Sequence, residues 1–107
     1  MKEVSTYTVD IFIAGDIADA RRICREQCMA IGLCVTVTPT EFIYTGGAES
    51  VVRVGLVNYP RFPSTPEELW QTAQKIAEAL RAGLCQWSYL LVAPDKSAWI
   101  SNRPDER

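Results

Sequence analysis

The chain has 107 residues, of which 48% are hydrophobic and 22% are charged, as is ordinary for one small globular domain. Its formal net charge is −2, so it lacks the basic excess with which most small nucleic-acid-binding domains neutralise phosphates. It contains no histidine, which excludes the commonest general base and the commonest metal ligand.

The first strand and the first helix are predicted from residues 6–32. Residues 6–14 alternate between the two faces of a strand, and one of these faces is fully apolar. Asp16 stands at the N-cap position of a helix whose apolar stripe continues to Ile31. Gly32 suits the left-handed conformation that ends a helix.

Residues 33–59 are expected to form two strands joined by a tight turn. Residues 33–38 and 42–44 share a strand pattern, and Pro39 between them marks a bend or an edge position. The glycine-rich turn at 45–49 closes a hairpin. The return strand over 51–59 is apolar on both faces, which is typical of a central or doubly covered strand.

A second helix follows the stiff, proline-containing linker at 60–63. Thr65 and Glu68 are spaced as a capping box, and Pro66 occupies the first helical position between them. Gly83 is expected to end this helix or its last full turn.

The last elements complete an α+β fold. Residues 87–93 read as a strand, and a turn at 94–97 leads to a possible short fifth strand at 98–100. The order predicts a ferredoxin-like βαββαβ sandwich, in which a four-stranded antiparallel sheet carries both helices on one face. We expect one domain over 1–107, with a core at about 6–101 and a loose tail at 102–107.

Two predicted strands resemble those of an RNA-recognition motif. Residues 11–15, Ile-Phe-Ile-Ala-Gly, are similar to the first-strand motif of that family, and its third-strand pattern can be laid on residues 52–59. The pattern meets Val52 where its basic residue belongs, and it meets Val54 and Leu56 where base-stacking rings belong. Since Phe12 alone keeps a ring, the resemblance implies the scaffold rather than RNA binding.

The helix-free face of the sheet is the main candidate site. We expect it to expose an aliphatic and aromatic surface, which usually marks a partner site. Its predicted residues are Asp10, Phe12, Val54 and Leu56. Secondary candidates for contact are Tyr59, Arg61, Trp87 and Trp99, although the tryptophans could simply complete the core.

These features lead to a non-enzymatic interaction protein as the main hypothesis. It would act by protein–protein contact through the helix-free face, as a homodimer or against another protein, with no cofactor and no membrane contact. The alternative is a small-ligand binder or a cofactor-free dimeric enzyme with a cavity at the sheet face, by analogy with dimeric ferredoxin-like monooxygenases. Its candidate polar groups are Asp10, Glu41, Tyr44, Tyr59 and Arg61. Single-stranded RNA binding is the third hypothesis.

The connection at 58–69 also permits two interpretations. Arg61 and the following helix start could bind an anion. We favour a rigid surface connection in which Tyr59 and Phe62 pack over the core, because a helix cap needs no ligand.

The four cysteines also leave two interpretations open. Their spacing at 24, 28, 34 and 85 matches no common metal-binding pattern, so we interpret them as buried free thiols that pack like small hydrophobic residues. A metal or redox site is the alternative.

Residues 10–47 resemble the small accessory proteins of bacterial phages and prophages in general character. That resemblance implies a bacterial cytoplasmic setting and the binding of a host or phage macromolecule. No apolar run approaches the ~20 residues of a membrane span, and residues 1–5 show no secretory signal, so we predict the cytoplasm as the location.

Overall fold

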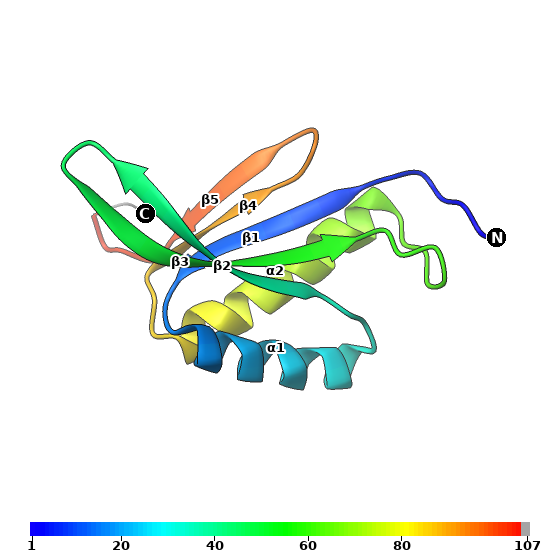
Figure 1. Cartoon of the computed structure of the whole chain (residues 1–107), viewed down its shortest axis with the longest axis horizontal. Coiled ribbons are helices and arrows are strands. Elements are labelled where there is room, and N and C mark those ends of the chain that lie inside the picture. Colours follow the sequence, from blue (N-terminus) through cyan, green and yellow to red (C-terminus); the bar gives the residue numbers. More distant parts are fainter. Residues whose placement is uncertain (106–107) are drawn as a thin grey trace.

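The computed structural model describes residues 1–105, which form two helices and one five-stranded sheet (Figure 1). The elements are β1 (Thr8–Ala14), α1 (Ile17–Ile31), β2 (Thr36–Tyr44), β3 (Gly47–Val57), α2 (Pro66–Gly83), β4 (Ser88–Val92) and β5 (Ser97–Ser101). The sheet is antiparallel with the strand order β2-β3-β1-β4-β5, and both helices lie on the same face. The predicted α+β, ferredoxin-like arrangement is confirmed, and the possible fifth strand is present as β5.

The predicted helix ends are confirmed in detail. The Asp16 side chain accepts a hydrogen bond from the Asp19 backbone N–H at 3.0 Å, and Gly32 closes α1 with a φ of 81°. At the start of α2, the Glu68 N–H donates to the Thr65 hydroxyl at 3.1 Å, and the Thr65 N–H donates to the Glu68 carboxylate at 2.9 Å. This capping box satisfies two backbone donors that would otherwise lack partners.

The β2–β3 hairpin is longer than the sequence suggests. β2 continues through Pro39, which lies opposite Val52, instead of breaking there. Because β2 is an edge strand, a residue without a backbone N–H can be accommodated on its unpaired side. Gly46, with a φ of 88°, provides the left-handed residue of the two-residue turn between Tyr44 and Gly47.

The orientation predicted for β3 is wrong. Ile11 of β1 pairs with Val54, and Val9 pairs with Leu56, so these side chains point to the same face of the sheet. That face is covered by the helices, and Val54 and Leu56 are 0% and 3% exposed. The two residues therefore belong to the core and not to the helix-free face. The resemblance to an RNA-recognition motif does not extend to this strand, because the positions of its stacking rings point into the core.

The helix-free face carries the other two residues of the predicted interaction face. Phe12 and Asp10 alternate with the buried residues of β1 and so lie on this face. Arg53 binds the Asp10 carboxylate at 2.8 Å, and its guanidinium lies 5.7 Å from the centre of the Phe12 ring. Phe42 lies against Phe12 with ring centres 5.6 Å apart. This part of the helix-free face therefore carries an ion pair next to two aromatic rings.

Two further features concern the C-terminal residues and the apolar character of the two helices. Residues 102–105, the described part of the predicted tail, contain no helix or strand, and 106–107 lie outside the described residues. Within residues 1–105, neither helix combines the length and the apolar character needed to cross a membrane.

Candidate functional site

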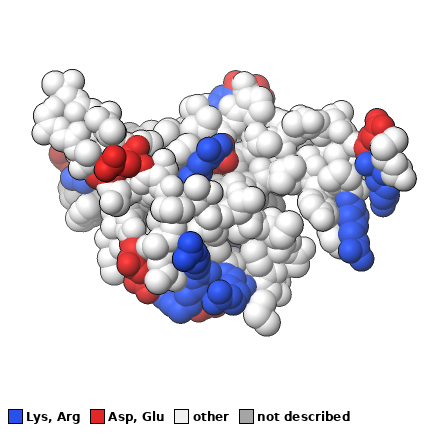
Figure 2. Space-filling model, viewed as in Figure 1, with Lys and Arg blue, Asp and Glu red and all other residues white. Residues whose placement is uncertain are grey.

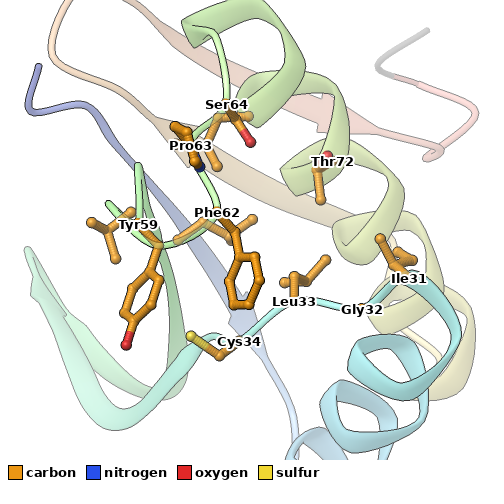
Figure 3. A pocket seen from close by; sticks show the side chains of 12 residues that line it. Ile31, Gly32, Leu33, Cys34, Tyr59, Phe62, Pro63, Ser64 and Thr72 are labelled. Carbon is orange, nitrogen blue, oxygen red and sulfur yellow. The ribbon is translucent and has the colours of Figure 1, made fainter. Parts of the chain in front are cut away.

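A cleft of about 290 Å³ opens where the end of α1, the end of β3 and the start of α2 meet (Figure 3). Its volume is at the lower end of the range for small-molecule sites, ~300–1,000 Å³. Leu56 and Leu69 contribute its buried apolar part, and Ser64 and Thr72 contribute hydroxyl groups. The cleft thus combines an apolar interior with a few polar groups, as small-ligand sites usually do.

Asn58 holds the loop that forms one wall of the cleft. This residue is only 8% exposed, and its backbone N–H and both polar atoms of its side chain form hydrogen bonds. Its backbone N–H donates to the Tyr7 carbonyl, its side-chain N–H donates to the Ser5 carbonyl, and its side-chain oxygen accepts from the Ser64 N–H, each at 2.8 Å. The N-terminal segment and the β3–α2 loop are therefore tied together next to the cleft.

Two aromatic rings form the mouth of the cleft. The Phe62 N–H donates to the Tyr59 carbonyl at 2.9 Å, which closes a turn that brings the two side chains side by side. The rings stack with centres 6.2 Å apart and an angle of 18° between their planes. Figure 3 shows both rings pointing toward the strand-entry segment that carries Leu33 and Cys34. The pair offers flat π surfaces to a ligand.

The rings are not packed over the core, so the interpretation favoured for residues 58–69 is wrong on this point. Tyr59 is 44% exposed and Phe62 is 64% exposed. Two exposed rings at the mouth of a cleft are typical of a recognition surface rather than of core completion.

Positive charge borders the cleft. The Arg61 guanidinium lies 5.4 Å from the centre of the Phe62 ring, and Arg61 also lines a neighbouring hollow together with Lys2 and Tyr59. Figure 2 shows basic side chains at the end of the molecule where the N-terminus and the β3–α2 connection lie, and over α1. Among the described residues that line the cleft itself, none is a carboxylate. An anionic group on a ligand therefore finds its partners at the rim.

The structure separates the residues that the sequence analysis had grouped. Tyr59 and Arg61 lie together at the cleft, which is not on the helix-free face. Trp87 and Trp99 line a hollow of about 200 Å³ on the helix-free face, together with Phe12. They are 50% and 56% exposed, so neither completes the core.

Most lining residues of the cleft were not predicted as site residues, among them Cys34, Phe62, Ser64 and Thr72. The stretch at 58–69 gave the only usable signal, since it places rings, an arginine and a helix start close together. Cys34 and Thr72 come from separate parts of the chain, and only the tertiary fold brings them to the same cleft.

The interpretation of the cysteines as buried thiols holds for one of the four. Cys24 is buried, and burial together with the neighbouring Cys28 raises its pKa to about 11. Cys28 is half-buried, whereas Cys34 and Cys85 are exposed. Within residues 1–105 all four are free thiols, and no cluster of three or more ligating side chains is placed to hold a metal ion.

Comparison with known proteins gives a structural match without a sequence match. No protein-family profile and no curated protein sequence matches the chain. A solved structure described as phage SAM lyase in the apo state aligns with a TM-score of 0.79 and 15% identity, over 96% of both chains. A phage SAM lyase in complex with S-methyl-5′-thioadenosine aligns with a TM-score of 0.71 and 13% identity, over 94% of this chain and 95% of that one.

These neighbours contradict the main functional hypothesis. Both are enzymes and one holds a small-molecule ligand, whereas we predicted a non-enzymatic protein that acts through protein–protein contact on the helix-free face. The alternative of a small-ligand binder or cofactor-free enzyme fits the neighbours better. At this level of identity the match shows that the chain shares the fold of proteins from phages.

Proposed function

We propose that this protein is a lyase that binds SAM, S-adenosylmethionine, in the cleft beside Tyr59 and Phe62 and releases S-methyl-5′-thioadenosine. The observation that carries the proposal is the stacked aromatic pair at the mouth of a cleft of small-molecule size. The two phage SAM lyases of the same fold supply the class of ligand. We also propose the bacterial cytoplasm as the place of action, since the structural neighbours are phage proteins.

The chemical groups of SAM match those of the cleft one by one. An adenine ring stacks on aromatic side chains, and the rings of Tyr59 and Phe62 present such surfaces. The sulfonium is a cation that aromatic faces attract by ~0.5–2 kcal/mol. The hydroxyls of Ser64 and Thr72 suit a ribose, and Arg61 at the rim suits the carboxylate of the amino-acid end.

The reaction needs few protein groups. The bond between the sulfonium sulfur and the γ carbon breaks, and its electron pair neutralises the sulfur to give the thioether of S-methyl-5′-thioadenosine. The substrate's own carboxylate attacks the γ carbon and closes a five-membered lactone, so no water and no outside base is consumed. The alternative, loss of a β proton, requires a base. The described residues that line the cleft include no carboxylate, and the Cys34 thiol and the Tyr59 phenol are their only ionisable side chains. We therefore propose ring closure, with the cleft positioning the carboxylate and the sulfonium.

The proposal is tested by incubating the purified protein with SAM and separating the products by liquid chromatography and mass spectrometry. We expect S-methyl-5′-thioadenosine and homoserine lactone, or the homoserine into which the lactone opens. Phe62→Ala should weaken S-methyl-5′-thioadenosine binding about 5- to 150-fold, because a lost base–aromatic stack costs ~1–3 kcal/mol. Calorimetric titration of both proteins measures this difference.

Trp99→Ala is the matched control, because Trp99 is also an exposed ring but lies on the other face of the sheet. This variant should bind and cleave as the wild type does. Normal binding by Phe62→Ala would contradict the cleft as the ligand site, and weakened binding by Trp99→Ala alone would place the ligand on the helix-free face. Vinylglycine in place of the lactone would contradict ring closure but not the lyase itself.

A further inference from the structure

Cys28 and Cys34 meet beside the cleft although they come from different elements. Both line a hollow of about 280 Å³ together with Arg21 and Arg25 on the outer side of α1. Both also line a second hollow of about 470 Å³, which includes Tyr59. Cys34 in addition lines the proposed substrate cleft (Figure 3). Cys34 thus belongs both to the pair that it forms with Cys28 and to the lining of the proposed substrate cleft.

The end of α1 brings the two thiols together. The Cys28 carbonyl accepts hydrogen bonds from the Gly32 and Leu33 N–H groups at 2.8 and 3.4 Å, so the chain turns back at this point. The Val35 N–H then donates to the Cys28 sulfur. Burial raises the pKa of the Cys28 thiol, and the neighbouring Cys34 raises it further.

We propose that Cys34 and Cys28 form a thiol–disulfide switch that reacts with low-molecular-weight disulfides such as oxidised glutathione. The exposed Cys34 thiolate attacks the disulfide, forms a mixed disulfide and releases one thiolate. Cys28 then attacks the Cys34 sulfur, forms the Cys28–Cys34 bond and releases the second thiolate. The two cysteines lose two electrons and the small disulfide gains them, so the exchange balances. Arg21 and Arg25, which line the same hollow as the pair, attract the anionic reagent.

The switch would control the cleft. The bond to Cys28 turns the Cys34 sulfur toward α1 and pulls the segment at 32–35 with it, which reshapes one wall of the cleft. We expect the oxidised protein to bind S-methyl-5′-thioadenosine at least fivefold more weakly than the reduced protein. This second part of the inference rests on the proposed function, whereas formation of the disulfide does not.

Exchange with oxidised glutathione tests the first part, and Cys85 is its internal control. Cys85 is exposed like Cys34 but lines neither of the two hollows that contain Cys28 and Cys34, so it should stop at the mixed disulfide. Mass spectrometry of peptides from the oxidised wild type should show a Cys28–Cys34 bond and a glutathionylated Cys85. Cys28→Ser should trap the mixed disulfide on Cys34. If wild-type Cys34 remains glutathionylated as Cys85 does, the switch is disproved.

Calorimetric titration with S-methyl-5′-thioadenosine tests the second part. Reduced wild type and reduced Cys28→Ser should bind equally, since Cys28 does not line the cleft. Oxidised wild type should lose affinity and recover it after dithiothreitol. Equal binding in both states would contradict control of the cleft. Absence of binding in both states would contradict the proposed function while the disulfide itself stands.

Discussion

Tyr89 shows at the scale of one residue how a polar group is held in this core. Its side chain is 2% exposed, and its hydroxyl donates a hydrogen bond to the Glu78 carboxylate at 2.6 Å. Arg81 also binds this carboxylate at 3.0 Å, one turn along α2. The hydrogen bond from Tyr89 and the charge of Arg81 lower the pKa of Glu78, while burial and the carboxylate raise the pKa of Tyr89. Both groups therefore keep the protonation states that their contact requires.

This contact predicts a pH dependence of stability. A carboxylate whose pKa is lower in the folded state stabilises the fold above its ordinary pKa, 4.5 for glutamate, and loses this contribution as the pH falls. The melting temperature of the wild type should therefore fall more steeply below about pH 4.5 than that of Glu78→Gln, which has no charge to lose. Thermal unfolding by circular dichroism between pH 3 and 7 measures both slopes, and parallel curves would contradict the assigned role of Glu78.

At the scale of elements, the start of α2 contributes both to the stability of the fold and to the shape of the cleft. Thr65 caps this helix, and Ser64 just before it lines the cleft and is bound by Asn58. The position of the cleft wall thus depends on where the helix begins.

Thr65→Ala should therefore destabilise the protein. Loss of an N-cap costs ~0.5–2 kcal/mol, which corresponds to a decrease of about 4–8 °C in melting temperature per kcal/mol for a domain of this size. Thr38→Ala on the edge strand β2, where the side chain is exposed, is the control and should change the melting temperature much less. Differential scanning calorimetry compares the variants. An equal effect of both would show that the capping box adds nothing beyond the loss of a threonine.

The elements and their ends could be predicted because their signals are local. Asp16, Gly32, Thr65 and Glu68 act within one helical turn of their own positions, so the sequence contains the complete cause. The orientation of β3 could not be obtained in this way. Its residues are apolar on both faces, and only the pairing of Val54 with Ile11 on another strand decides which face turns inward.

The candidate site was predictable only in part, for the same reason. Tyr59 and Arg61 stand in a short stretch that already contained rings, charge and a helix start. The rest of the cleft depends on the packing of α1 against the β3–α2 connection, which brings Cys34 and Thr72 near that stretch. No periodicity or spacing marks residues that meet only through tertiary structure.

At the scale of the whole molecule, the predicted homodimer stays a prediction. Trp99 of β5 pairs with Leu90 of β4 and is exposed on the helix-free face. Its ring offers an apolar surface to a second copy of the chain. Light scattering should give twice the 12.0 kDa mass of the chain. Trp99→Glu should shift the mass to that of one chain without altering its circular dichroism spectrum, and a wild-type mass of 12.0 kDa would contradict self-association.

The bond between Asn58 and the Ser5 carbonyl has a practical consequence. It anchors the first residues beside Tyr59, and in Figure 1 the described C-terminal residues, drawn in red beyond β5, lie toward the opposite end of the long axis from the N-terminus. A purification tag or a surface linker attached ahead of Met1 would sit at the entrance for the small molecule. Attachment after the last residue leaves that entrance open, so immobilised protein for binding studies should be tethered by its C-terminus.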